Sequence, residues 1–225
     1  MKRFTVTPRN TTLLISLAAL VLLGACQRKP AEPNMENFTK AVNSYLAERG
    51  HLCLAKYDWP IYVSDQDAQD THSRDAVQLP VMEKLGLVKS TAMVLERTAD
   101  DGVTKIKAPG REYVLTDEGK KYYLHQPVVL ATATKTVTHD ADFCVATLTL
   151  DKVVGWEQPV TRDGQTKTSV LFTYKIEPAP FTKDADFQRV FPMVVRVIEG
   201  AGTIQEREGM RLTKDGWVAE EYFQR

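Results

Sequence analysis

Asp65, Asp67, Asp70 and His72 form the densest group of potential metal ligands in this chain. Carboxylate oxygens at short spacing are ligands that Ca²⁺ prefers, so an EF-hand loop is the first pattern to test. A loop starting at Asp65 lacks the glycine required at its sixth position and the glutamate required at its twelfth. An irregular cation site is the alternative, but the sequence favours a solvated acidic loop, and we expect no metal or other cofactor.

His139 lies near Asp140, Asp142 and Cys144, and this is the second group that could carry chemistry. The group could hold a metal or act in acid–base catalysis, although spacing for four zinc ligands is absent. A related hypothesis is a small hydrolase with Cys53 or Cys144 as the nucleophile and a histidine as the base. The chain has no Gly-x-Ser-x-Gly, Ser-x-x-Lys, Walker or dinucleotide-binding pattern. We therefore expect a protein that is not an enzyme and has no catalytic residue.

The N-terminal residues have the pattern of an export signal. Three basic residues among the first nine precede an apolar run over 13–23, which is shorter than the roughly 20 residues that a spanning helix needs. Leu23-Gly24-Ala25-Cys26 ends this run and resembles the lipobox of bacterial lipoproteins. The resemblance implies that 1–25 is a signal peptide, that Cys26 is lipidated, and that 26–36 is an extended tether.

Gln27 follows the lipidated cysteine in this interpretation. In Gram-negative lipoproteins an aspartate at this position usually retains the protein in the inner membrane, so the resemblance implies an outer-membrane anchor facing the periplasm. Three of the 29 Lys and Arg residues precede residue 27, whereas all 29 Asp and Glu residues follow it. The mature chain is thus slightly acidic and has no basic cluster, which argues against a nucleic-acid partner.

Cys53 and Cys144 remain once Cys26 is assigned to the lipid. An oxidising periplasm makes a disulfide between them the natural hypothesis, and it would tie the two halves of the chain together. Two separate buried thiols are the alternative, because the sequence does not show that the two Cα atoms lie close enough. A bridge would also remove the thiol nucleophile of the hydrolase hypothesis.

Hydrophobic periodicity predicts helices in the first half of the chain and strands in the second. Residues 36–49 read as an amphipathic helix with Gly50 as a left-handed cap, and Pro80 is expected to separate two shorter helices. From residue 126 the period becomes two, which predicts an antiparallel sheet of five or six strands, one of them over 190–198. The predicted class is α+β, with a domain boundary near residue 126.

Three local patterns between residues 37 and 125 occur together in one known fold. They are Leu85-Gly86-Leu87-Val88 at a helix end, a hairpin around Gly102, and Leu115-Thr116-Asp117-Glu118-Gly119 at a helix start. Together they resemble the recognition helix, wing and following helix of winged-helix domains. DNA-binding members carry excess Arg and Lys there, whereas this segment balances them with acidic residues. The resemblance thus implies a winged-helix-like half at 37–125, packed with an antiparallel β domain at 126–225, and no DNA binding.

Trp59 and Trp156 are the candidate partner-binding residues, because each lies where a strand is expected to end. Core packing is the alternative role for both. The mature chain also resembles uncharacterised Gram-negative lipoproteins, through Val153-Val154-Gly155-Trp156 and Leu212-Thr213-Lys214-Asp215-Gly216-Trp217-Val218. We predict a membrane-anchored, non-enzymatic binding or envelope-assembly module with an envelope protein as partner. The alternative is a protective, immunity-type lipoprotein that neutralises a toxin, lysozyme or antibiotic.

Overall fold

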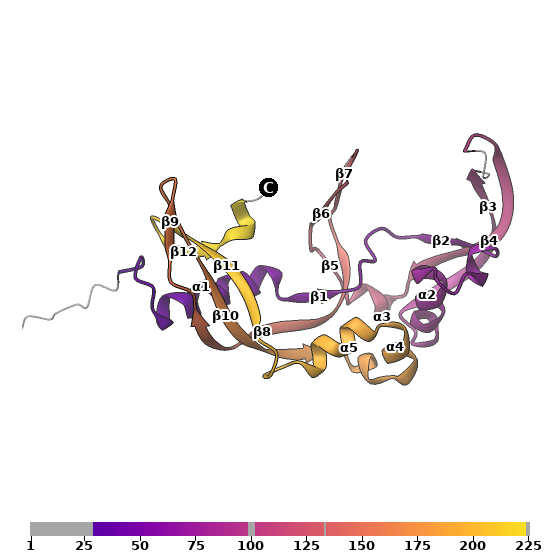
Figure 1. Cartoon of the computed structure of the whole chain (residues 1–225). Coiled ribbons are helices and arrows are strands. Elements are labelled where there is room, and N and C mark those ends of the chain that lie inside the picture. The colour runs from indigo at the N-terminus through magenta and orange to yellow at the C-terminus, as the bar shows by residue number, and fades with distance from the viewer. Residues whose placement is uncertain (1–28, 99–101, 133, 224–225) are drawn as a thin grey trace, which may run out of the picture.

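The chain folds into an elongated α+β molecule in the computed structural model (Figure 1). The structure describes residues 29–98, 102–132 and 134–223. The predicted signal peptide, Cys26 and the first residues of the tether lie outside these ranges. Within them, no helix has both the length and the apolar character that a membrane crossing requires. The predicted α+β class is confirmed.

The helices and strands alternate along the chain in several blocks. The α-helices are α1 (Met35–Arg49), α2 (Arg74–Lys84), α3 (Asp117–Lys120), α4 (Ala185–Val190) and α5 (Pro192–Glu199). Short 3-10 helices are η1 (Asp67–Gln69), η2 (Pro180–Lys183) and η3 (Glu220–Phe223). The strands are β1 (His51–Cys53), β2 (Ile61–Ser64), β3 (Val88–Thr98), β4 (Lys105–Leu115), β5 (Tyr123–Leu124), β6 (Val128–Ala131), β7 (Thr136–His139), β8 (Asp142–Trp156), β9 (Val160–Arg162), β10 (Gln165–Pro178), β11 (Glu206–Thr213) and β12 (Gly216–Ala219).

Helix α1 begins at a side-chain cap and ends against the sheet. Asn34 Oδ1 accepts a hydrogen bond from the backbone N–H of Asn37 at 2.9 Å, and Phe38 is fully buried one turn later. The left-handed cap predicted at Gly50 is wrong, because its φ is −77°. Glycine is needed there for space instead. A Cβ on Gly50 would lie 2.4 Å from the carbonyl oxygen of Leu46 and 2.5 Å from that of Leu148.

A single antiparallel sheet with strand order β1-β8-β10-β11-β12 runs through much of the molecule. Strand β5 also pairs with β8, and β9 pairs with β10. Asp163 and Gly164 form the predicted turn between β9 and β10, and both have positive φ as a two-residue hairpin of this kind requires. Strands β8 and β10 are long and curl along their length, and α1 packs against β8 and β12 (Figure 1).

A second, three-stranded sheet has the order β2-β4-β3, and α2 precedes its long hairpin. The helix break predicted before Pro80 is wrong, because α2 continues from Arg74 to Lys84. Pro80 is exposed, so its ring lies on the solvent side, where it displaces no packed neighbour. Leu79 and Met82 on the other side are fully buried. Gly86, with φ of +73°, follows the helix as predicted.

The strand predicted over 190–198 is wrong, because this segment forms the end of α4 and most of α5. The side chain of Asp184 accepts hydrogen bonds from the N–H groups of Asp186 and Phe187, at 2.8 and 3.2 Å, and so starts α4. Pro192 is the first residue of α5. A capping aspartate and a proline at the first helical position are helix-start signals, and here they outweigh the strand preference of the Val-rich run.

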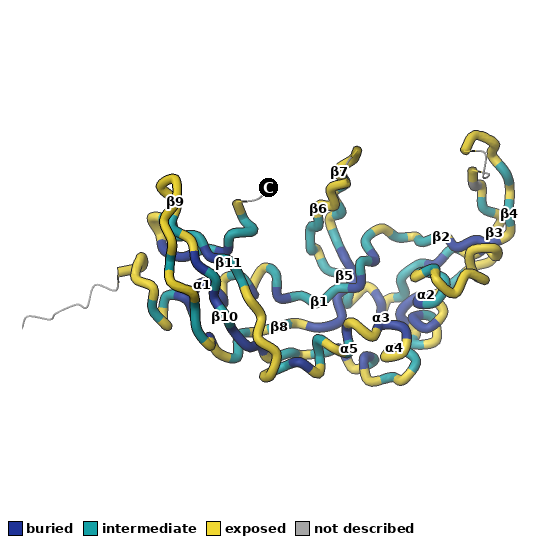
Figure 2. The backbone as a smooth tube through the Cα atoms, in the orientation of Figure 1, coloured by how far each residue is buried: buried dark blue, intermediate teal, exposed yellow. Residues whose placement is uncertain are grey.

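Two hydrophobic cores hold the molecule together, and each draws residues from both sides of residue 126. The α1 core comprises Phe38, Ala41, Val42, Leu46, Val153, Val170, Phe172, Met210, Trp217 and Ala219. The α2 core comprises Leu54, Val63, Leu79, Val81, Met82, Leu87, Val88, Tyr113, Phe143, Val145, Phe187, Val190, Phe191 and Val194. Strand β8 contributes to both cores. Residues 142–146 and Val153 of this strand are buried, so β8 reaches from one core to the other (Figure 2).

Candidate functional site

The predicted bridge between Cys53 and Cys144 is confirmed. The two cysteines face each other in the register of β1 and β8, so the bridge links neighbouring strands. It joins residues that are 91 positions apart in the sequence. Because both sulfurs are bonded, neither is a free nucleophile, and the hydrolase hypothesis that used one of them has no thiol available at these positions.

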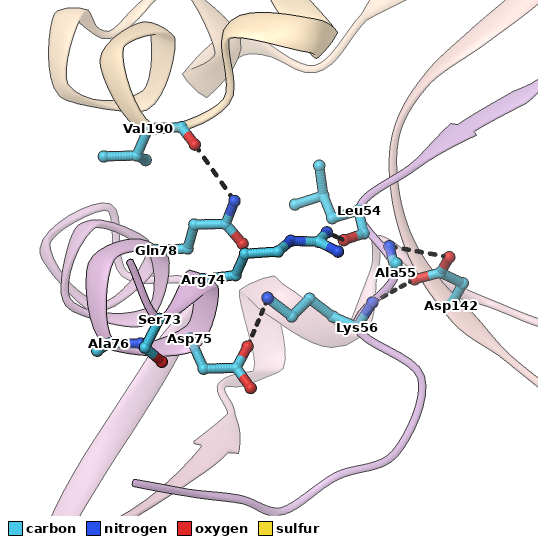
Figure 3. Close-up of polar contacts among 10 residues, drawn as sticks. All are labelled: Leu54, Ala55, Lys56, Ser73, Arg74, Asp75, Ala76, Gln78, Asp142 and Val190. Atoms are coloured by element: carbon cyan, nitrogen blue, oxygen red, sulfur yellow. Dashed lines mark hydrogen bonds and ion pairs between the residues drawn. The ribbon is translucent and has the colours of Figure 1, made fainter. Parts of the chain in front are cut away.

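Asp142 binds the irregular backbone that follows the bridge (Figure 3). Its carboxylate accepts hydrogen bonds from the N–H groups of Ala55 at 3.2 Å and Lys56 at 2.8 Å. A third comes from the N–H of Phe143 at 2.7 Å. Ala55 has a positive φ of 57°, so the chain leaves the ladder of β1 here and its N–H groups need another acceptor. Burial raises the pKa of the Asp142 carboxyl, and these three hydrogen bonds oppose that shift.

Lys56 connects the same loop to α2. Its side chain is only 3% exposed, and its Nζ lies 2.6 Å from Oδ1 of Asp75 in the first turn of the helix. One turn further on, Gln78 Nε2 donates to the carbonyl oxygen of Val190 at 3.2 Å. Figure 3 shows how these contacts join the loop, α2 and α4. The side chains of Lys56, Asp75, Gln78 and Asp142 thus form a polar junction. This junction holds the loop after β1, α2 and α4 against one another, which is a positioning role.

His139 does not form a site with Asp142 and Cys144, although these residues and Asp140 were candidates for metal binding or acid–base catalysis. Its Nδ1 lies 2.9 Å from Oδ2 of Asp58, and its ring stacks on Tyr57 at 4.4 Å between centroids. The Asp142 carboxylate binds the backbone of the loop instead. The structure thus separates the predicted partners into two local contacts.

The acidic group at 65–72 is an exposed turn. The hydroxyl of Ser64 donates to Asp67 Oδ2 at 2.7 Å, and Asp70 Oδ1 accepts from the backbone N–H of His72 at 2.9 Å. The side chain of His72 is 94% exposed. Across the part of the chain that the structure describes, no three His, Cys, Asp or Glu side chains gather as metal ligands would. These contacts are those of a capped surface turn.

Trp59 and Trp156 both pack against hydrophobic cores. Trp59 contacts the α2 core, and Trp156 contacts the α1 core with its ring 5.0 Å from that of Phe38. Each is half-buried. Packing against the cores therefore covers much of the surface of both side chains.

The β3–β4 and β6–β7 hairpins project from the side of the molecule toward which the β9–β10 hairpin also points (Figure 1). Strands β6 and β7 pair with each other in a separate two-stranded sheet, and Val129 and Leu130 are 51% and 41% exposed. The β3–β4 hairpin is longer, but β2 supports it only opposite 110–113. Met93, which is opposite Gly110 at the end of this support, and Val94 just beyond it are exposed as well. Figure 2 shows exposed backbone over the outer parts of both hairpins.

Sequence patterns did not reveal these hairpins as a candidate site. The segment 128–138 reads as one strand, because no glycine or proline marks the turn between β6 and β7. Comparison with protein-family models, with curated proteins and with solved structures found no match for the chain. The candidate site therefore rests on geometry: the partly apolar β3–β4 and β6–β7 hairpins project from a body whose elements a polar junction connects.

Proposed function

We propose that this protein is a lipid-anchored, periplasm-facing binding module that holds an envelope protein on the β3–β4 and β6–β7 hairpins. The lipobox-like sequence ending at Cys26 supports the anchor, and the exposed hairpins support the binding role. The outer-membrane location rests on Gln27, as argued from the sequence. The chemistry proposed is recognition of another protein and involves no catalysis.

The main support for the binding role is that β6 and β7 pair only with each other in the described structure. A two-stranded hairpin without a third strand or a covering layer is marginally stable in water. In β6, three of the four residues are exposed, including Val129 and Leu130. Because each of these side chains is already about half buried, covering its remaining exposed surface with a partner would contribute about 1 kcal/mol. A partner that covers this hairpin would thus supply the packing layer that it lacks in the described structure.

The position of the anchor supports access to the hairpins. Residues 29–34 form a turn on α1, because Asn37 Nδ2 donates to the carbonyl oxygens of Lys29 and Glu32, each at 2.9 Å. Only Gln27 and Arg28 lie between Cys26 and this turn. A lipid on Cys26 would therefore hold the α1 end near the membrane. The β3–β4 hairpin lies at the other end of the elongated molecule (Figure 1).

We also retain a winged-helix-like origin for the N-terminal half as a proposal. The support is the order β2-β4-β3, with α2 before the hairpin and Thr116 capping the short helix after it. Thr116 Oγ1 accepts from the N–H of Gly119 at 3.0 Å. Helix α1 packs in the other core, so this support covers residues 61–120 better than 37–60.

Photo-crosslinking in cells tests the proposed function. A photoreactive amino acid at Val129 of the full, exported chain should give a discrete adduct with an envelope protein. Met193 is the matched control, because it is apolar, is 66% exposed and belongs to α5, a helix on the side of the body away from the β6–β7 hairpin (Figure 1). Equal adducts at Val129 and Met193, or none at Val129, would contradict the proposal. The identity of the adduct would separate assembly from the protective alternative.

A further inference from the structure

Among the residues that the structure describes, strand β3 is the free edge of its sheet, because the order is β2-β4-β3. The direction of its backbone groups follows from two contacts. The N–H of Ser90 donates to Glu83 Oε1 at 2.7 Å, so this group points away from β4. On the other side of β4, the carbonyl oxygen of Pro109, which is opposite Val94, accepts from Asp65 N–H at 2.9 Å.

Both contacts give the same alternation. The register of β3 on β4 has no shift from residue 88 to 98, so backbone groups point outward at every second residue. The Ser90 contact shows that the even-numbered residues of β3 direct their backbone groups away from β4. The contact of Pro109, which is opposite Val94, gives the same result. The N–H and C=O groups of Ala92, Val94 and Glu96 therefore face the free edge. Such a row of unpaired groups is a template for another strand.

A groove of about 360 Å³ lies between residues 93–96 of β3 and the end of β2 with the turn that follows it. Its apolar walls include Tyr62, Met93 and Leu95. Gly110 faces Met93 across the ladder and contributes no side chain to the groove. A Cβ at Gly110 would lie 2.6 Å from Leu95 Cδ1, so the glycine lets the Leu95 side chain lie across β4. A long apolar side chain of an added strand can enter this groove only by reaching across β3.

The same groove is bordered by carboxylates. Asp67 and Glu96 both line it, and both are exposed. Ser64 donates to Oδ2 of Asp67, which leaves Oδ1 available to a ligand. Charged rims of this kind select opposite charge in the partner and set its register. A basic side chain on the added strand would meet this requirement.

We propose that β3 binds an extended peptide segment of a partner protein by strand addition, with an apolar side chain in the groove and a lysine or arginine at Asp67 and Glu96. The backbone of the peptide pairs with Ala92, Val94 and Glu96, which supplies affinity, and the groove supplies specificity. This inference rests on the proposed protein-binding function and names the chemistry of the segment that is bound.

The test uses random twelve-residue peptides displayed on phage and selected on the full chain in detergent. Selection should enrich peptides that contain alternating apolar residues and at least one lysine or arginine. Val94→Pro removes one outward N–H and leaves the ladder to β4 intact, since the edge of a sheet tolerates proline at such a position. It should weaken binding of the selected peptides at least about tenfold. Val94→Ala keeps the N–H but shortens a side chain that lines the groove, so its loss of affinity should be clearly smaller than that of Val94→Pro.

Glu96→Lys is the second variant, and it should lose several-fold affinity for the basic peptides while it keeps the edge. Circular dichroism and thermal unfolding of each variant check that the hairpin remains folded. No enrichment, or equal binding to Val94→Pro, would overturn the inference. The crosslink at Val129 tests the proposed function separately. If Val94→Pro still gives this crosslink and still binds the selected peptides, the protein-binding function stands and strand addition at β3 fails.

Discussion

The α1 core and the α2 core satisfy their buried backbone groups in different ways. Around the α1 core, one helix covers a curled sheet, so regular ladders pair most backbone groups, and ion pairs such as that between Arg211 and Glu220 lie at the edge. Around the α2 core, the chain leaves the ladder after Cys53, and the buried Asp142 carboxylate accepts the N–H groups that no strand pairs. The Asp142 carboxylate thus accepts hydrogen bonds that a neighbouring strand would otherwise accept.

This difference explains where polar residues are tolerated. An unpaired buried N–H costs about 1–3 kcal/mol, so a carboxylate that accepts three of them is stabilising even though its own burial is unfavourable. Lys56 and Asp75 extend the same polar group to α2. The α2 region is therefore specified by a few side chains, whereas the α1 region is specified by a repeating pattern.

The largest expected effect tests whether the two cores unfold as one unit. Phe38→Ala in the α1 core and Phe187→Ala in the α2 core each remove a fully buried ring and should cost about 3–5 kcal/mol. Because β8 enters both cores, each variant should shift the transitions of both regions. Chemical unfolding followed by Trp59 alone, with Trp156 and Trp217 replaced by Phe, reports the α2 core. An unchanged Trp59 transition in Phe38→Ala would show that the regions unfold separately.

Removal of the bridge should have the next largest effect and should act first on the α2 region. Replacing both Cys53 and Cys144 by Ala should cost about 2–4 kcal/mol, since the bridge closes a long loop in the unfolded chain. Denaturant unfolding of this variant is compared with that of the unsubstituted protein in the oxidised and the reduced state. A reducing agent should destabilise only the protein that retains the cysteines, and equal stability of all three samples would contradict the expectation.

The smallest effect is a difference of sign in pH dependence. Burial raises the pKa of Asp142 above 3.8, so its contribution to stability is full below that value and is lost as pH rises through the folded pKa. Hydrogen bonding to Arg211 and Lys167 lowers the pKa of Glu220 below 4.5, so its contribution is present above 4.5 and is lost as pH falls.

Variants Asp142→Asn and Glu220→Gln should therefore change the slope of stability against pH in opposite directions. Asp142→Asn removes a contribution that favours acid, and Glu220→Gln removes one that favours neutral pH and amounts to about 1 kcal/mol or less. Denaturant unfolding between about pH 3 and pH 7 measures both slopes. Parallel changes in the two variants would mean that the burial of Asp142 does not control its titration.

Local signals predicted the parts of the fold that local contacts determine. Thr116 caps the helix that follows it, Asp163 and Gly164 turn the β9–β10 hairpin, and Phe38 and Val42 face a core at helical spacing. The predicted bridge also holds, because only two cysteines remained to be paired. The Val-rich run from 190 shows the limit: its composition favours a strand, whereas most of it forms α5, which begins at Pro192 directly after the Asp184-capped α4.

The candidate site needed information that no local pattern carries. The groove exists because β2 lies beside β4, which brings Tyr62 and Asp67 near Met93 and Glu96. The backbone N–H and C=O groups of Val94 point to the free edge because of the pairing register, and a shift of one residue would turn them toward β4. The opposite holds for the candidate metal ligands at 65–72. They are close in sequence, but among the described residues their side chains do not gather around one point.

The position of the bridge within β1 has a mechanical consequence. Cys53 is the last residue of β1, and the chain continues from it through residues 54–60 to the β2 sheet that carries the β3 edge. Tension between a membrane anchor before α1 and a partner on β3 would load this short connection and peel β1 from β8. The sulfur–sulfur bond transfers that load at Cys53 into β8, the longest strand of the described molecule. The bridge would thus act as a clamp that keeps a pull on the hairpin from unravelling the connection between the two ends of the protein.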